Sequence, residues 1–231
     1  MTNHEPGLLA IWSTIAPESE IDYLHWLTRE HVFERTRVAG FQSGRVFRRR
    51  GSRPSEYMML YELDHAGVMS SPGYLARLND PTPWTQRIMP SLERFRRGGG
   101  TIVAQGGDPA GHGSHVAIAR FEEALPERLS GEAGRTLVSA LARIDWVANT
   151  QIMSVEDDAT SIATQEKSMR RSSEGAFAGL LLMEALDAGS LDRAIARASD
   201  LGHIQPDQFE IYDLVFACHP NPPEPPVHGN D

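Results

Sequence analysis

The sequence predicts an α+β protein in which one order of elements, β-α-β-β-α-β, occurs twice. Two observations support this prediction. Apolar runs of strand length and segments of helical periodicity follow one another in the same order along both parts of the 231-residue chain. A glycine-rich connector, GGDPAGHGS at 106–114, separates the two series. Each series has the order of a split βαβ unit, which is expected to form a four-stranded antiparallel sheet with its helices on one face.

The first unit is expected to span residues 1–106. Its opening strand is an apolar run, and the helix that follows has Ser19 as a candidate N-cap. Prolines divide the later helical segment into two short helices near Asn79. The predicted elements are a strand, a helix, two strands, the divided helical segment and a strand, at 8–15, 19–37, 41–50, 56–63, 70–95 and 101–105.

The second unit is expected to span residues 107–220 and to repeat this order. Leu137, Leu141 and Ile144 mark one face of its first helix. The predicted elements are a strand, a helix, a hairpin of two strands, a helix and a strand, at 115–122, 135–147, 150–158, 176–186, 190–201 and 209–219. The tail at 221–231 is rich in proline and lacks periodicity, so it is predicted to be disordered.

The helix-free face of each predicted sheet alternates apolar side chains and cannot stay bare in water. Two such sheets can cover each other and enclose a cavity. This packing can occur within one chain or between the two chains of a homodimer, and the sequence leaves both arrangements open.

Composition excludes several classes of function. The formal net charge of -9 repels a phosphate backbone and argues against nucleic acid as a partner. No apolar run approaches the roughly 20 residues of a membrane span, and the N-terminal residues lack the pattern of a secretory signal. We therefore expect a cytoplasmic protein without a membrane partner.

Cofactor and metal signatures are also missing from the sequence. Cys218 is the only cysteine, and Lys167 is the only lysine. Because Lys167 lies in the polar stretch TQEKSMRRSSEG, we expect it on a solvated hairpin and not in the desolvated pocket of a reactive lysine. His25 and His31 are six residues apart, which does not suit a metal-binding helix face. No cofactor and no metal are predicted.

The strongest candidate for chemistry is the pair His31 and Arg35. The two residues are four apart and therefore adjacent on a helix, where a histidine can transfer a proton and an arginine can hold an anion. A solvated charged helix face would give the same pattern. The corresponding helix of the second unit is apolar and lacks both residues, which favours a functional role.

Other candidates lie on the strands and in the loop NDPTPW. Alternation puts Arg45 on one face of its strand, from which it could bind an anionic substrate. Tyr61 shares a face with Tyr57 and Met59, and its phenol could donate to a substrate carbonyl. The tryptophans that could surround a ring are Trp12, Trp26 and Trp84, although Trp12 and Trp84 could equally be structural anchors.

The first unit resembles the dimeric α+β barrel superfamily, which has a ferredoxin-like fold. The residues that resemble its uncharacterised EthD-like members are the W-x4-H-x3-R spacing of Trp26, His31 and Arg35, then GFQSGRVFR, EYMMLYEL and NDPTPW. The match covers residues 8–105, and the second unit resembles the fold by order of elements alone. The resemblance implies a tandem duplication that packs as an α+β barrel, with the histidine at the barrel mouth.

The sequence therefore predicts a cofactor-independent catabolic enzyme. His31 and Tyr61 would be catalytic, while Arg35, Arg45 and the three tryptophans would bind a small aromatic or lactone-type carboxylate. A lyase of the decarboxylase type, or an isomerase, is the main interpretation. A cofactor-free monooxygenase of the same superfamily and a non-catalytic small-molecule-binding accessory protein are the alternatives.

Overall fold

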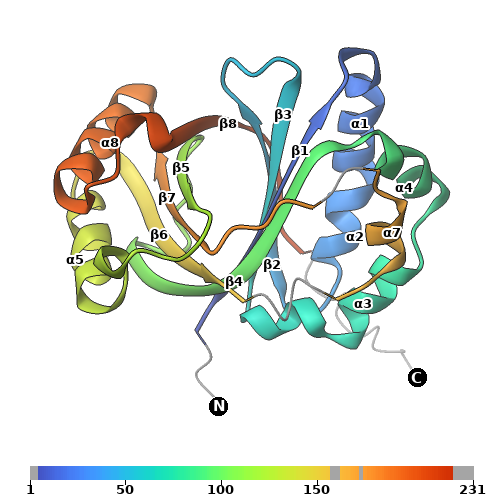
Figure 1. Cartoon of the computed structure of the whole chain (residues 1–231), viewed down its shortest axis with the longest axis horizontal. Helices are drawn as coiled ribbons and strands as arrows, with labels where there is room; N and C mark the ends of the chain where they lie inside the picture. Colours follow the sequence, from blue (N-terminus) through green and yellow to red (C-terminus); the bar gives the residue numbers. More distant parts are fainter. Residues whose placement is uncertain (1–4, 157–161, 172–173, 221–231) are drawn as a thin grey trace, which may run out of the picture.

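The computed structural model describes residues 5–156, 162–171 and 174–220, and it shows a closed barrel of eight antiparallel strands (Figure 1). Around the barrel the strand order is β1-β3-β2-β8-β5-β7-β6-β4. The strands are β1 (Gly7–Ile15), β2 (Phe41–Arg49), β3 (Ser55–Leu63), β4 (Glu93–Gly107), β5 (His115–Phe121), β6 (Val147–Val155), β7 (Gly179–Ala185) and β8 (Phe209–Cys218). The tail predicted to be disordered, 221–231, lies outside the described residues.

The two halves of the barrel have the same strand order. The first half reads β4-β1-β3-β2 and the second reads β8-β5-β7-β6, which is the order of a split βαβ unit in both cases. The halves join where β2 pairs with β8 and where β4 pairs with β6. The predicted fold class is therefore confirmed, and the barrel closes within one chain. A homodimer and the unit boundary near residue 106 remain predictions.

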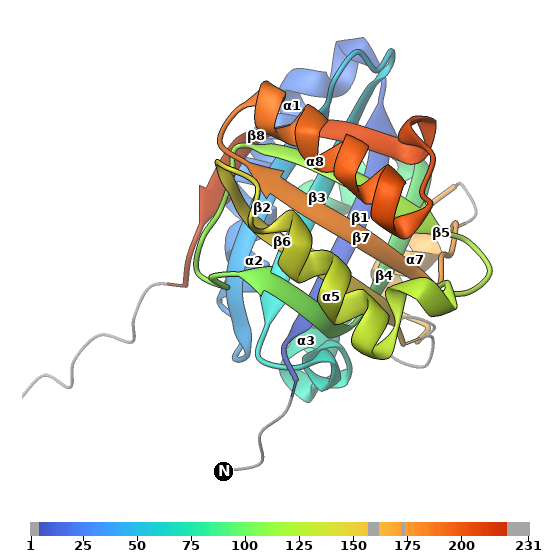
Figure 2. The ribbon, with the colours of Figure 1, turned by 90° about the vertical axis from the view of Figure 1, so that its left-hand side faces the viewer.

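The helices lie outside the barrel on two opposite sides (Figure 1). Figure 2 shows α5 and α8 lying over the sheet that contains β6 and β7, while α1 to α4 and α7 cover the other side. The helices are α1 (Glu20–Trp26), α2 (Val32–Thr36), α3 (Pro72–Asn79), α4 (Pro83–Ile88), α5 (Gly131–Leu141), α7 (Gln165–Met169) and α8 (Ala188–Gly202). A π-helical turn, Leu27–His31, joins α1 to α2. Short 3-10 turns are Pro17–Ser19, Ala66–Ser70, Met89–Ser91, Glu127–Leu129 and Pro206–Gln208.

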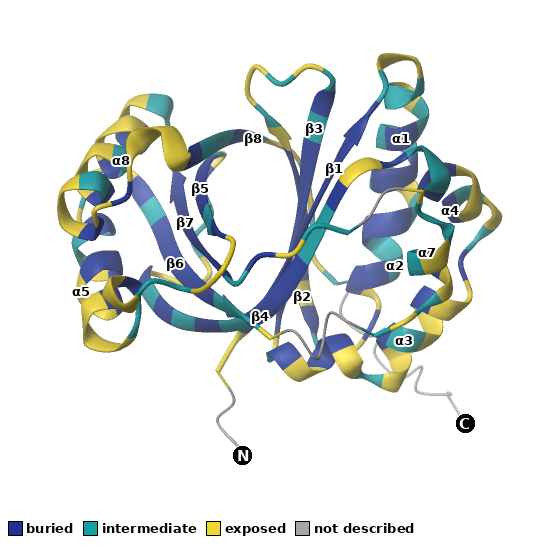
Figure 3. Ribbon diagram, viewed as in Figure 1, coloured by how far each residue is buried: buried dark blue, intermediate teal, exposed yellow. Residues whose placement is uncertain are grey.

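Apolar side chains form three layers: one under each group of helices and one inside the barrel. Figure 3 shows that the helices bury the sides that face the strands. The inside of the barrel is packed with side chains such as Leu8, Trp12, Met58 and Phe177. The sequence predicts a cavity between the two sheets, but the cavity described below lies between the first half's sheet and its helices.

Strand β4 is much longer than the predicted strand at 101–105. Its first part pairs with β1 inside the first half, and its second part pairs with β6 where the two halves join. Glycines at 98–100 hide the strand from a pattern search because they carry no side chain to alternate. Their role is close packing: a Cβ on Gly100 would lie 1.9 Å from the carbonyl oxygen of Ser154.

Two predicted helix boundaries are wrong. Ser19 makes no capping hydrogen bond, because the chain already turns into a 3-10 helix at Pro17. The helix predicted at 135–147 begins at Gly131 and ends at Leu141. Beyond Leu141 the chain turns through Trp146, which has a left-handed φ of 70° and is largely exposed, so that β6 can begin at Val147.

The connection between β6 and β7 is not the predicted solvated hairpin. It is 23 residues long, far more than the two to five residues that a hairpin needs. Its helix α7 packs against α3 and α4 of the first half, and the Gln165 N–H donates to Asn79 Oδ1 at 3.1 Å. A segment of the second half therefore covers the helical side of the first.

Within the described ranges, no helix is long and apolar enough to cross a membrane.

Candidate functional site

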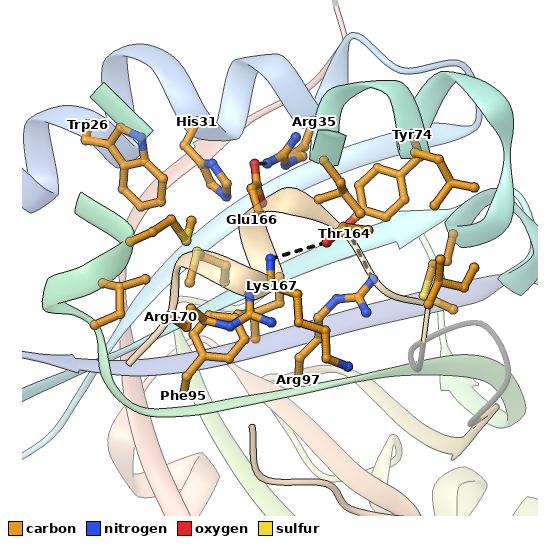
Figure 4. A pocket seen from close by; sticks show the side chains of 18 residues that line it. Trp26, His31, Arg35, Tyr74, Phe95, Arg97, Thr164, Glu166, Lys167 and Arg170 are labelled. Carbon is orange, nitrogen blue, oxygen red and sulfur yellow. Dashed lines mark hydrogen bonds and ion pairs between the residues drawn. The ribbon is translucent and has the colours of Figure 1, made fainter. Parts of the chain in front are cut away.

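A cavity lies between the outer face of the first half's sheet and the helices that cover it (Figure 4). Its apolar lining comes from β1, β3, β4 and the helical layer, and includes Ile11, Met59, Met69, Met89, Leu92 and Phe95. The space open to the centres of water molecules is about 30 Å³, enough for about two waters. A larger ligand must therefore displace side chains, and the three flexible methionines are suited to repacking.

A π-helical turn positions the aromatic end of the cavity. In a regular α-helix, residues five apart point about 140° away from each other. The wider turn at Leu27–His31 instead brings Trp26 and His31 to the same side, with ring centroids 4.1 Å apart. The Trp26 indole N–H donates to Thr85 Oγ1 at 3.0 Å, which fixes the surface against which the imidazole lies. Turns of this kind occur frequently at functional sites.

His31 is a buried and neutral imidazole. Its side chain faces the cavity (Figure 4), the residue is 4% exposed, and Nδ1 has no hydrogen-bond partner among the described residues. Burial lowers the pKa of His31 well below its usual value, and the nearby Arg35 charge acts in the same direction. At neutral pH the ring is therefore uncharged, and it has a nitrogen that can accept a proton.

Arg35 lies one turn further along the helix and forms a buried ion pair with Glu166 of α7. Burial lowers the pKa of Arg35, but Glu166 together with the nearby Tyr74 and Tyr61 outweighs that effect, and the net pKa lies above the usual value. The pair uses Nη2 of the guanidinium. Nη1 is buried without a hydrogen-bond partner among the described residues, so it remains a donor for an oxygen inside the cavity.

Tyr61 lies beside this site but does not line the cavity. It shares the helix-facing side of β3 with Tyr57 and Met59, as predicted. Its hydroxyl is fully buried, has no hydrogen-bond partner within the described ranges, and has a pKa well above its usual value because of burial. The Arg35 charge opposes that rise, which places the phenol within electrostatic reach of the guanidinium.

The structure does not bring Arg45 or Trp12 together with His31. Both face the inside of the barrel because alternation along β1 and β2 puts them on the other side of the sheet. Arg45 is held by Glu184 at 2.7 and 3.1 Å and by Glu62 at 3.1 Å, so two carboxylates already balance its charge. The Trp12 ring packs edge-on against Phe177.

Trp84 also lies outside the cavity lining. It is partly buried in the helical layer, where its indole N–H donates to Asp22 Oδ1 at 3.0 Å. This bond joins α4 to α1 and supports the anchoring role that the sequence left open.

Sequence reasoning missed the basic wall of the cavity. Lys167 and Arg170, from the connection that carries α7, line the cavity together with Arg97 of β4. Lys167 lies on helix α7 and not on a hairpin, and its partly exposed side chain lies 3.5 Å from Glu174. The available signal was the length of the connection, since long loops in compact proteins are often functional.

Among the residues that the structure describes, no group of three or more histidine, cysteine, aspartate or glutamate side chains could hold a metal ion. The residues that meet at the cavity are a base, an ion pair and further basic groups around an apolar space.

No protein-family model matches the sequence, and no curated protein is found to be similar to it. Solved structures do share the fold. An anthrone oxidase-like protein superimposes with a TM-score of 0.58 at 11% identity, over 96% of this chain and 95% of its own. The chain is an α+β barrel. A protein from Fusobacterium nucleatum, provisionally named a monooxygenase, gives a TM-score of 0.60 at 8% identity, over 95% of this chain and 96% of its own.

A second protein provisionally named a monooxygenase, from Lactobacillus acidophilus, gives a TM-score of 0.52 at 7% identity, over 94% of this chain and 97% of its own. At such low identity these likenesses show the fold alone. They agree with the fold that the resemblance implies, whereas membership of the dimeric α+β barrel superfamily and of its EthD-like subfamily remains a prediction.

Proposed function

We propose that the protein is a cofactor-independent enzyme of the monooxygenase type, in which His31 removes a proton from a small ring compound bound in the cavity. The observation that carries the proposal is the buried neutral imidazole, whose Nδ1 has no partner among the described residues and which lies on an apolar cavity. A neutral imidazole has one unprotonated nitrogen, which can act as a general base toward a proton donor bound in the cavity.

The site suits a substrate with an acidic C–H or O–H group. A buried imidazole with a lowered pKa is a weak base, so the proton it takes must come from an acidic group. The substrate anion that remains would face the new imidazolium and the unpartnered Nη1 of Arg35. Both charges stabilise the anion where water is excluded, and such electrostatic stabilisation usually contributes more to catalysis than any other single effect.

An electron-rich carbanion or phenolate can react with dioxygen without a metal or an organic cofactor. One electron passes to dioxygen, the two radicals combine to a hydroperoxide, and loss of water leaves a ketone. For a ring methylene group, the carbon loses two hydrogens and gains one oxygen as a carbonyl, and the second oxygen leaves with those hydrogens as water. The proton held by His31 returns to the departing oxygen. The chain's own tasks are to bind and orient the ring, exclude water and hold that proton.

The comparisons favour this alternative over a lyase or an isomerase, because the similar structures are named monooxygenases and an anthrone oxidase-like protein. Their identity is too low to transfer an activity, so the argument rests on His31. A non-catalytic binding protein would have no need for an unpartnered base at the ligand.

The test is oxygen consumption by the purified protein with ring compounds that carry acidic C–H or O–H groups, beginning with anthrone and dihydroxybenzoates. We expect one dioxygen to be consumed for each ketone formed, and a kcat lower by about 100-fold or more in His31→Gln. Arg135→Gln, an exposed position on α5 that is not part of the cavity lining, is the control. Unchanged turnover in His31→Gln would remove the proposed base, and ligand-induced stabilisation without product would favour a binding protein.

A further inference from the structure

Basic side chains dominate the wall of the cavity that faces His31. Among the described residues that line the cavity, four are cationic and one is anionic: Arg35, Arg97, Lys167 and Arg170 against Glu166. This concentration of positive charge occurs in a chain whose net charge is -9. A local excess of this sign raises the concentration of anions at the site.

Two of these basic groups depend on one carboxylate. Lys167 Nζ lies 3.5 Å and Arg170 Nη2 lies 2.6 Å from the same oxygen of Glu174, which is not part of the cavity lining. Arg35, in contrast, forms a buried ion pair with Glu166, whose charge also acts electrostatically on Arg170. A second anion at the wall would therefore give Lys167 and Arg170 a charge partner each.

Arg170 is the more constrained of the two. Its guanidinium lies over the Phe95 ring, 4.0 Å from the centroid, and its side chain is 6% exposed. Burial lowers the pKa of Arg170 and the neighbouring Arg97 acts in the same direction, whereas Glu174 opposes them. A buried cation in this environment is stabilised by an anion in the cavity, and a planar guanidinium can hold a carboxylate with two hydrogen bonds.

The basic wall and the base lie at opposite sides of one space. Figure 4 shows Trp26 and His31 on the helix side, and Lys167, Arg170 and Arg97 on the side of β4 and α7. A ring between the two sides would present one edge to His31 and the other to the basic wall. The acidic group of such a ligand would then lie away from the reacting atom, where its charge does not oppose formation of the anion at His31.

We propose that the ligand is a ring compound with a carboxylate, and that Lys167 and Arg170 form the subsite for this carboxylate. The inference rests on the proposed function for the place of the reacting atom, but the subsite itself can be tested without turnover. The sequence assigned the substrate carboxylate to Arg35 and Arg45. This proposal assigns the carboxylate to a segment contributed by the second half of the chain, and Arg35 keeps its role beside the reacting atom.

The single lysine makes an occupancy test possible. An amine-reactive label can modify only the N-terminal amine and Lys167 in this sequence, and peptide mass spectrometry separates the two sites. We expect benzoate and 2-naphthoate to slow labelling of Lys167 but not of the N-terminus. The corresponding amides, benzamide and 2-naphthamide, should protect at least about tenfold less well at equal concentration. Equal protection by acids and amides would overturn the proposal.

Affinity measurements with variants provide a second test of the carboxylate subsite. Titration of 2-naphthoate, followed by tryptophan fluorescence, should give a Kd raised about tenfold in Lys167→Met and in Arg170→Gln, with the Kd of 2-naphthamide unchanged. Lys167→Arg keeps the charge and should restore most of the affinity, and Arg135→Gln on α5 of the second half is the surface control. A loss of affinity for acid and amide alike would show a packing effect and would overturn the charge-specific subsite.

The two proposals fail in different ways. If 2-naphthoate binding depends on Lys167 and Arg170 while His31→Gln keeps full turnover, the subsite stands and the proposed base does not. If His31→Gln abolishes turnover while the acids bind no better than the amides, the base stands and the subsite is refuted.

Discussion

The buried imidazole of His31 predicts a specific pH dependence of stability. Its pKa in the folded protein lies well below the value near 6.5 that an unfolded histidine has, chiefly because of burial. Below pH 6.5 the unfolded chain therefore binds a proton at this position that the folded chain does not bind. The contribution is fully present above pH 6.5 and is lost progressively as the pH falls below that value.

The magnitude follows from this linkage. An unfolded histidine is about 10% protonated at pH 7.5 and about 90% protonated at pH 5.5. For a ring that stays neutral in the folded state, the free energy of unfolding drops by about 1.4 kcal/mol between these two pH values because of this residue alone. In a domain of ordinary marginal stability such a change is easily measured.

The assay is urea unfolding followed by tryptophan fluorescence at pH 7.5, 6.5 and 5.5. Wild-type protein and His31→Gln are compared, so that all other titrating groups cancel in the difference. The wild type should lose about 1.4 kcal/mol more than His31→Gln between pH 7.5 and 5.5. Met59→Leu, in the same cavity, should follow the wild type. Parallel profiles for the wild type and His31→Gln would refute a buried neutral ring.

Two further predictions concern the barrel itself. Glu184→Gln leaves the buried Arg45 with one carboxylate, so the free energy of unfolding measured in urea titrations should fall by about 3 kcal/mol. The exposed Glu132→Gln is the control and should change it by less than about 0.5 kcal/mol. Gly100→Ala puts a Cβ 1.9 Å from a backbone oxygen of β6 and should lower the melting temperature severely. Gly73→Ala is the control: it lies on a helix, its added Cβ would be 3.7 Å from the nearest atom, and the melting temperature should stay equal or rise. An equal loss in either matched pair would contradict the packing described.

Much of the fold could be predicted because local pattern and tertiary structure agree. Alternation on β3 put Tyr61 and Met59 on one face and Met58 on the other, and the structure shows that division between helical layer and barrel interior. The long strand β4 could not be predicted in full. Its glycines at 98–100 make close contacts with residues far along the chain, which a periodicity search does not see.

The candidate site could be predicted on its helix but not on its opposite wall. The spacing of His31 and Arg35 correctly predicted that both lie on one face of the helix, and both line the cavity. Trp26 lines it too because of a π-helical turn, which no sequence pattern predicted. Alternation along β2 correctly put Arg45 and Val46 on opposite faces of the sheet. It could not say which face of the sheet would border the cavity, because that depends on which side chains fill the barrel.

The contribution of α7 to the cavity could not be predicted from the sequence, for a physical reason. A five-residue helix has too few turns to show an amphipathic pattern, and the polar letters around Lys167 look like those of a solvated loop. Their burial comes from partners in the first half: Arg35 for Glu166 and Phe95 for Arg170. Such long-range pairing becomes visible only when the barrel has placed the two halves side by side.

The difference between the two halves therefore has an explanation other than a functional half and an idle one. In the second half, α5 packs Leu137, Val138 and Leu141 against its sheet as a plain apolar layer. The long β6–β7 connection of the same half reaches the other side of the molecule, where it supplies Glu166, Lys167 and Arg170 to the cavity. His31, Arg35 and Arg97 come from the first half, and Glu166, Lys167 and Arg170 come from the second. Because the cavity is complete only when both are present, closure of the barrel within one chain is what holds the candidate site together.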